Sequence, residues 1–195
     1  MRSRITLLCL SVGFFAAGTL TAAHAAGVTG RVTLARGTAG EAVVYLEGSA
    51  PARPLTHAIV DQRDKMFEPH VLVVTRGTTV RFPNNDTVFH NVFAYFQAKK
   101  FDLGMYPRGA TKSITFDKTG LVVLLCNVHS DMSAYIMVVD TPYYAVTDGQ
   151  GRFRLPNVPP GAYTLHAWHE SGAMLTQTVT IGGQTAPLTL TLARK

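Results

Sequence analysis

The chain has 195 residues, of which 47% are hydrophobic and 15% charged, and its formal net charge at pH 7 is +6. This composition excludes a disordered or collagen-like chain and allows one large or two small folded domains. The sequence has two cysteines, Cys9 and Cys126, which excludes a disulfide-dense scaffold and a four-cysteine zinc site. Lysine and arginine are dispersed and no RNA-binding motif is present, so nucleic acid is not an expected partner.

Residues 1–25 have the order of a secretory signal peptide. Arg2 and Arg4 precede an uncharged apolar run over residues 5–20, and the segment AHA at 23–25 supplies the small residues of a cleavage site. The run is shorter than the roughly 18 residues that a membrane-spanning helix needs. We therefore expect a periplasmic protein whose mature chain has about 170 residues, a net charge of about +4 and no membrane span. Its remaining cysteine, Cys126, would then form a dimer, react or bind a metal.

Short β-strands are predicted along nearly the whole mature chain. Segments rich in Val, Ile, Thr, Phe and Tyr are bounded by Gly, Pro, Asn or Asp, and no window of about 12 residues or more has a helical period. The segments are 30–34, 42–46, 70–75, 79–82, 111–116, 121–126, 135–139, 162–168, 175–181 and 187–192. This pattern predicts an all-β fold built of antiparallel β-sandwiches.

The run CNVHSDM at residues 126–132 carries the most specific chemistry. It lies between two predicted strands and places a thiolate (Cys126), an imidazole (His129) and a thioether (Met132) on one loop. This mixture of soft ligands suits copper, which binds two histidines and one cysteine in a plane with a distant axial methionine. The second histidine has to come from elsewhere, and His90 in FPNNDTVFHNVF follows a predicted strand and turn. These four residues are the predicted metal ligands.

Residues 55–140 resemble a cupredoxin of the plastocyanin and amicyanin kind. The resemblance rests on the segments MFEPHVLVVTRGTTVRFPNNDTVFHNV, ATKSITFDKTG and LLCNVHSDMSAYIMVV, and it extends to cupredoxin-like proteins labelled methylamine-utilisation proteins. It implies a Greek-key β-sandwich that binds one type 1 (blue) copper ion through His90, Cys126, His129 and, axially, Met132.

Two asparagines are candidates for supporting the ligands from behind. Asn91 follows His90 directly, and its side chain or backbone is expected to tie the His90 loop to the ligand loop. Asn85, in the turn that precedes His90, is the second candidate. His166 and His169 are expected to be structural, because positions three apart on a strand face opposite sides. His70, at the start of a predicted strand, and His57, in a loop, are expected to be structural as well.

The two flanking segments, 26–54 and 141–195, together resemble a carboxypeptidase-regulatory-like (transthyretin-like) β-sandwich. The pieces TDGQGRFRL and VPPGAYTLHA in the second segment carry the resemblance, together with GRV and AVVYL in the first. We expect one smaller sandwich that is split in the sequence, with the domain at 55–140 inserted between its early strands. The alternative is that the N-terminal strands pair with the middle domain.

The cupredoxin resemblance implies an exported electron carrier that shuttles single electrons between periplasmic redox proteins, such as a dehydrogenase or a cytochrome. An acidic partner is compatible with the positive net charge. Two alternatives stay open: a periplasmic copper trafficking or storage protein that uses the same residues, and a metal-free structural module. The sequence has no Ser-His-Asp order, phosphate-binding loop or H-E-x-x-H run, and too few further histidines for a second copper site, so we do not expect an enzyme.

Overall fold

The computed structural model describes residues 26–48, 51–95, 98–172, 174–182 and 185–193. Within these residues the regular elements are β-strands, which confirms the prediction of an all-β fold. None of the described residues belongs to a helix that is long and apolar enough to cross a membrane. The predicted signal peptide at 1–25 lies outside the described residues.

The strands of the described part of the chain are short, as the spacing of turn residues predicts. In chain order they are β1 (Ala26–Leu34), β2 (Val43–Glu47), β3 (Asp61–Arg63), β4 (Met66–Glu68), β5 (Val71–Thr75), β6 (Thr78–Pro83), β7 (His90–Ala94), β8 (Phe101–Tyr106), β9 (Thr111–Phe116), β10 (Gly120–Leu125), β11 (Ser133–Val139), β12 (Tyr144–Val146), β13 (Arg152–Val158), β14 (Gly161–Trp168), β15 (Leu175–Ile181) and β16 (Leu188–Leu192).

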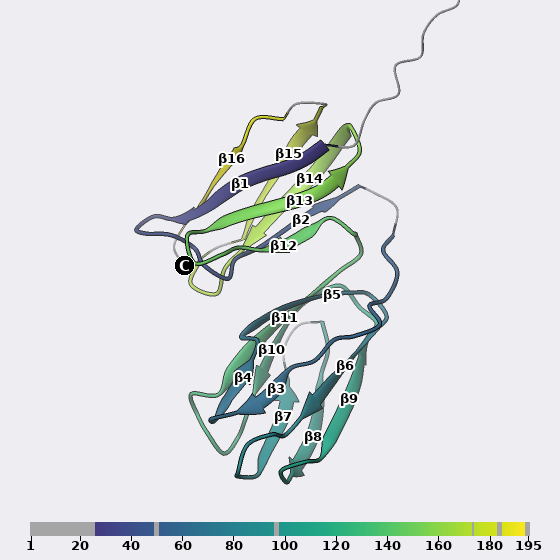
Figure 1. Cartoon of the computed structure of the whole chain (residues 1–195), viewed down its shortest axis with the longest axis vertical. Coiled ribbons are helices and arrows are strands. Elements are labelled where there is room, and N and C mark those ends of the chain that lie inside the picture. Colours follow the sequence, from purple (N-terminus) through teal and green to yellow (C-terminus); the bar gives the residue numbers. More distant parts are fainter. Residues whose placement is uncertain (1–25, 49–50, 96–97, 173, 183–184, 194–195) are drawn as a thin grey trace, which may run out of the picture.

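The strands from β3 to β11 build one sandwich, the lower body in Figure 1. One sheet has the order β5-β11-β10-β7-β8, and the other sheet is the antiparallel pair β6-β9. The short hairpin β3-β4 lies beside them. In β6, Thr78, Val80 and Phe82 are buried while Thr79 and Arg81 are exposed. This alternation buries one face of the strand against the core between the two sheets.

The remaining strands build a second sandwich, the upper body in Figure 1, from the two ends of the described chain. Its sheets have the orders β13-β1-β16 and β12-β2-β14-β15. Strand β1 is antiparallel to β13 and parallel to β16, and β2 lies between β12 and β14. The N-terminal strands therefore pair with strands from the far end of the chain, β12, β13, β14 and β16.

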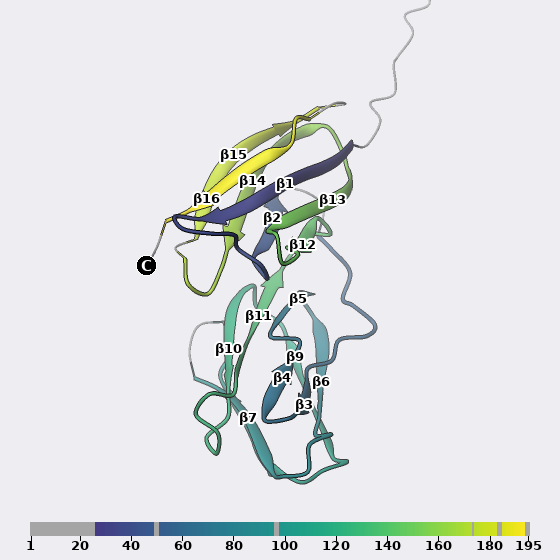
Figure 2. The ribbon, with the colours of Figure 1, turned by 60° about the vertical axis from the view of Figure 1, so that its left-hand side comes forward.

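The two sandwiches pack on each other through the outer faces of β2, β5, β11 and the end of β14 (Figure 2). In β11, Ile136 and Val138 point into the core of the lower sandwich, while Met137 and Val139 point to the contact between the sandwiches. We call the buried members of this contact the inter-sandwich cluster: Val43, Tyr45, Val71, Val73, Met137, Val139 and Trp168. Strands buried on both faces carry continuous apolar runs, which explains why VLVVT and YIMVV do not alternate.

Six strands lie outside the predicted segments, namely β3, β4, β7, β8, β12 and β13. Polar or turn-forming residues interrupt their apolar patterns. Strand β8 contains Asp102 and Gly104, the latter with a φ of 63°, and β13 contains Pro156 and then Asn157 with a φ of 56°. Pairing with neighbouring strands holds these segments extended in spite of their low strand propensity.

Candidate metal centre

Strand pairing brings His90 and Cys126 together although they lie far apart in the sequence. Strand β7 begins at His90, β10 ends at Leu125, and the two strands are antiparallel neighbours with Leu125 opposite Phe93. In an antiparallel pair the start of one strand lies beside the end of the other. Cys126, the first residue after β10, therefore lies beside His90 at one end of the sandwich.

The loop from Cys126 to Met132 is a tight turn that its own backbone holds closed. The amide of Cys126 donates to the carbonyl of Met132 at 3.2 Å, and the amide of Met132 donates to the carbonyl of His129 at 3.0 Å. Strand β11 begins with the next residue, Ser133, and pairs with β10 along its length. The two strands and these hydrogen bonds fix the positions of all three side chains that the loop contributes.

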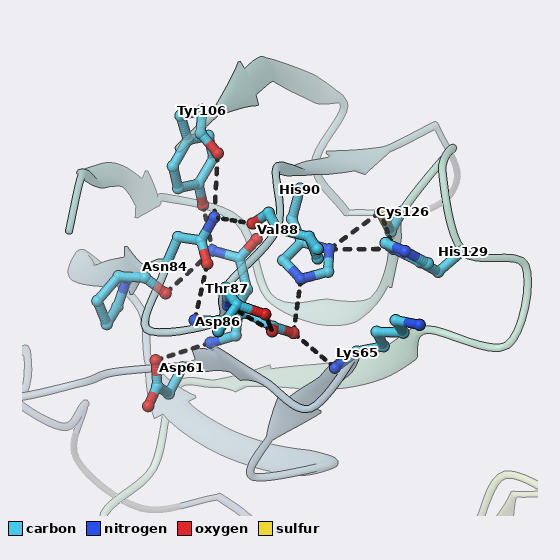
Figure 3. Close-up of polar contacts among 12 residues, drawn as sticks. Asp61, Lys65, Asn84, Asp86, Thr87, Val88, His90, Tyr106, Cys126 and His129 are labelled. Atoms are coloured by element: carbon cyan, nitrogen blue, oxygen red, sulfur yellow. Dashed lines mark hydrogen bonds and ion pairs between the residues drawn. The ribbon is translucent and has the colours of Figure 1, made fainter. Parts of the chain in front are cut away.

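The side chains of His90, Cys126 and His129 converge on one point (Figure 3). Nδ1 of His90 lies 3.1 Å from Nδ1 of His129 and 3.9 Å from Sγ of Cys126, and the distance from that sulfur to Nδ1 of His129 is 4.0 Å. Within the described ranges this is the one group of three or more His, Cys, Asp or Glu side chains close enough to share a metal ion.

The cluster is buried on all sides except that of His129. His90 is completely buried and Cys126 is 6% exposed, whereas the side chain of His129 reaches the surface. Met132 is 1% exposed and lies with Cys126 in the core of the lower sandwich. Met132 is therefore close to the cluster in the sequence, and its thioether is buried in the protein core.

These distances fit a metal ion bound by all three side chains. In zinc sites metal–nitrogen bonds are about 2.0–2.1 Å and metal–sulfur bonds about 2.3 Å, which places ligand atoms about 3–4 Å apart. All three atoms could therefore hold one ion. Two imidazoles and a thiolate in one plane are the donor set that copper takes in proteins, so the cluster is consistent with a copper site.

Of the two predicted supporting asparagines, Asn91 contacts the ligand loop and Asn85 does not. Oδ1 of Asn91, which is 1% exposed, accepts a hydrogen bond from the amide of Asn127 at 2.9 Å and so ties β7 to the residue after Cys126. Asn85 is exposed, and its side-chain amide donates to the carboxylate of Asp61 at 2.8 Å. Among its described contacts none reaches a ligand.

Two residues outside the predicted site support the cluster: Asp86 contacts His90, and Asn84 holds the turn that contains Asp86. Oδ2 of Asp86 is 2.9 Å from Nε2 of His90, and both side chains are buried. Asn84 is fully buried; its Nδ2 donates to the carbonyls of Val88 and Tyr106, and its Oδ1 accepts from the amide of Asp86. In the sequence, the pattern that could have indicated these residues is the motif Asn-Asn-Asp at 84–86, which ends four residues before His90.

The carboxyl group of Asp86 is ionised. Burial by itself would raise the pKa of Asp86, but the amide of Lys65, the ring of His90 and the amide of Thr87 donate hydrogen bonds to its oxygens. These hydrogen bonds favour the charged form and outweigh burial, so the pKa lies well below its ordinary range. A fixed negative charge therefore lies against His90.

The other histidines that the structure describes lie away from the cluster. Nδ1 of His70 lies 3.1 Å from the carbonyl of Ser133. The ring of His166 stacks on Tyr45 at a centroid distance of 4.7 Å, and Nδ1 of His169 lies 2.9 Å from the hydroxyl of Ser171. Each of these rings contacts protein groups outside the cluster, as expected for structural histidines.

Comparisons with known proteins match part of the chain to one family model and to several solved structures. Residues 132–193 match the family model of the carboxypeptidase regulatory-like domain. The search of curated proteins finds no match. Among solved structures, a purple cupredoxin from Nitrosopumilus maritimus is 21% identical, with a TM-score of 0.39 over 42% of this chain and 99% of that one. A mutant of amicyanin in the Cu(I) state is 20% identical, with a TM-score of 0.41 over 49% of this chain and 98% of that one.

A copper-containing nitrite reductase (NirK) from Thermus scotoductus SA-01 is 26% identical, with a TM-score of 0.42 over 50% of this chain. The matched part spans a quarter of the length of the reductase, 25% of that chain. The family match, the strand arrangement and the position of the cluster at the ends of β7 and β10 confirm the two resemblances drawn from the sequence. Part of the chain has a cupredoxin-like β-sandwich fold, and residues 132–193 match the carboxypeptidase regulatory-like model.

Proposed function

We propose that this protein is an exported type 1 copper protein that carries single electrons between redox proteins of the periplasm. The observation that carries the proposal is the buried group of His90, Cys126 and His129, whose ligand atoms lie 3.1–4.0 Å apart at one end of a β-sandwich. Met132, which follows on the same loop, would be a further, weaker ligand. Bound copper would supply one-electron chemistry by alternating between Cu(I) and Cu(II).

The frame around the cluster supports electron transfer rather than bond chemistry. His90 starts a strand of a five-stranded sheet, and Cys126 and His129 belong to one loop that is closed by its own hydrogen bonds. Ligands that are held in this way keep one geometry, so little reorganisation would accompany a change of oxidation state.

The partner is proposed to dock over His129, the ligand that reaches the surface. Val128, next to it in the chain, is 51% exposed, and Phe89, next to His90, is 56% exposed. Exposed apolar side chains beside a redox centre suit a transient protein contact. We propose a dehydrogenase or a cytochrome as the partner, with an acidic surface that complements the positive net charge of the chain.

A visible spectrum tests the copper site. Purified protein that has taken up Cu(II) should become intensely blue or green through charge transfer between the Cys126 thiolate and copper, and Cys126→Ser should be colourless. The matched control is His57→Ala, which removes an exposed histidine and should keep the colour. Failure of the wild-type protein to develop colour, or colour that survives Cys126→Ser, would overturn the type 1 assignment.

A second experiment separates a carrier from a copper trafficking protein. The loaded protein is cycled with ascorbate and ferricyanide in the presence of a strong copper chelator. A carrier should retain its copper through repeated cycles, and a trafficking protein should lose Cu(I) to the chelator. Export is tested separately by the mass of the protein recovered from the periplasmic fraction, which should lack the first 25 residues or nearly so.

A further inference from the structure

Asp86 lies directly behind His90, on the side of the ring that faces away from Cys126 and His129 (Figure 3). Its Oδ2 is 2.9 Å from Nε2 of His90, and the two side chains are 8% and 0% exposed. Water therefore has little access to this contact. A charge in such a place interacts with its neighbours more strongly than a charge at the surface, because the effective dielectric constant is lower.

The carboxylate of Asp86 is held in place from three directions. Oδ2 also accepts the amide of Lys65 at 2.7 Å, and Oδ1 accepts the amide of Thr87 at 2.6 Å. Lys65 lies at the tip of the β3-β4 hairpin, where it and Asp64 have φ angles of 59° and 51°. This left-handed turn presents the amide of Lys65 to the carboxylate. The hairpin, the turn before β7 and His90 thus meet at Asp86.

The contact decides which nitrogen of His90 is free. Both oxygens of Asp86 accept backbone amides, of Lys65 and Thr87, so the group acts as an acceptor and Nε2 of His90 is placed to donate its proton to it. Nδ1 can then be the unprotonated nitrogen, and it is the atom that points at the cluster, 3.1 Å from His129 Nδ1. The ring is held in the orientation and the tautomer that a metal ligand needs.

We propose that Asp86 is a positioning residue that orients His90 for copper and, through its negative charge, favours Cu(II) over Cu(I); this rests on the proposed function. A carboxylate that accepts the second ring N–H of a ligand histidine increases the basicity of the metal-binding nitrogen. A more basic nitrogen and a buried negative charge both stabilise the more highly charged ion. The residue thereby lowers the reduction potential of the site.

Asp61 provides a matched control. It is a carboxylate on the β3-β4 hairpin, which also supplies the Lys65 amide to Asp86, but it does not contact His90. Its Oδ1 accepts the side-chain amide of Asn85 at 2.8 Å and the backbone amide of Gln62 at 2.8 Å. Asp61→Asn removes the same formal charge as Asp86→Asn and disturbs the same hairpin and turn. A purely structural role of Asp86 predicts similar consequences for the two variants.

The experiment measures copper affinity by chelator competition and the reduction potential by spectroelectrochemistry, at one pH, in the wild type and both variants. We expect Asp86→Asn to bind Cu(II) about 10–100-fold more weakly and to lose much less affinity for Cu(I). A tenfold selective loss of Cu(II) affinity corresponds to a potential about 59 mV higher. Asp61→Asn should change neither affinity by more than about threefold. Equal affinities and potentials in the two variants would overturn the inference.

A metal-free measurement keeps the inference testable even if Asp86→Asn does not fold. In wild-type protein labelled with nitrogen-15, the His90 ring should show a slowly exchanging proton on Nε2, hydrogen-bonded to Asp86. A proton found on Nδ1 with Nε2 bare would overturn the inference. This arm needs no copper, so a wild-type protein that binds no copper would refute the proposed function and leave the role of Asp86 to be decided by the spectrum.

Discussion

His70 and Glu170 form an ion pair that joins the two sandwiches, with Nε2 of His70 3.0 Å from Oε2 of Glu170. His70 precedes β5 of the lower sandwich, and Glu170 follows β14 of the upper one. The other ring nitrogen, Nδ1, lies 3.1 Å from the carbonyl of Ser133, the residue after Met132. Both ring nitrogens thus lie within hydrogen-bond distance of an acceptor oxygen, one in each sandwich.

This pair should contribute a small coupling free energy. Its side chains are 33% and 41% exposed, so solvent screens the attraction and we expect about 0.5–1 kcal/mol. The measurement is a double-mutant cycle of His70→Ala and Glu170→Gln by urea unfolding, repeated at high salt, where the coupling should fall. A cycle on Arg152 and Asp148, which pair inside the upper sandwich, is the control. A coupling that is zero at low salt would contradict the prediction.

Asn91→Ala should loosen the ligand loop. The substitution removes the acceptor of the Asn127 amide, a contact that links β7 to the loop, and it should lower the free energy of unfolding by about 1–2 kcal/mol. Copper should also leave faster, as measured by transfer to a chelator. Asn85→Ala is the control, because Asn85 is exposed and contacts Asp61; we expect less than about 0.5 kcal/mol and unchanged release. Equal release rates in both variants would count against the role of Asn91.

Met137→Ala should weaken the contact between the sandwiches. Met137 is 1% exposed in the inter-sandwich cluster, and replacing a buried methionine with alanine typically costs about 2–5 kcal/mol of unfolding free energy. Trp168, the sole tryptophan, belongs to the same cluster, so its fluorescence reports the change. Met174→Ala, at a methionine that is 45% exposed, should stay within about 0.5 kcal/mol of the wild type. A cost as small as that of the control would mean that this contact contributes little to stability.

Stability should fall at high pH, and Tyr45 is one of the buried tyrosines responsible, together with Tyr106. Burial, and to a lesser extent the charge of Glu47, raise the pKa of Tyr45 from 10.0 to about 12. The folded state therefore keeps its phenol protonated where the unfolded state ionises, so this contribution is complete below pH 10 and is lost as the pH rises from 10 to 12. We expect a loss of about 2–3 kcal/mol across this window. Urea unfolding at several pH values should show it, and Tyr45→Phe should reduce the slope; an unchanged slope in that variant would contradict the assignment.

Three of the four predicted ligands lie within one short stretch of sequence, whereas the residues that support them do not. The spacing of Cys126, His129 and Met132 is local, so the loop can be read directly from the chain. The residues that support the ligands are less evident from the sequence, because Asn84 and Asn85 are neighbours of the same type and only Asn85 is a predicted supporting residue. Successive residues of an extended chain point to opposite sides, and the structure buries Asn84 and exposes Asn85. Which of the two faces inward depends on the register with β9 and on the adjacent hairpin.

The sequence by itself determined an all-β fold, the two family resemblances and the soft-ligand loop, because these depend on composition, on spacing along the chain and on the order of short motifs. The tertiary structure alone decided that Asp86 lies behind His90 and that one face of β11 packs against the other sandwich. It also decided that β1 lies between β13 and β16. Such contacts join distant segments and depend on which strands pair and in which register, and a local pattern of apolar and polar residues does not specify that choice.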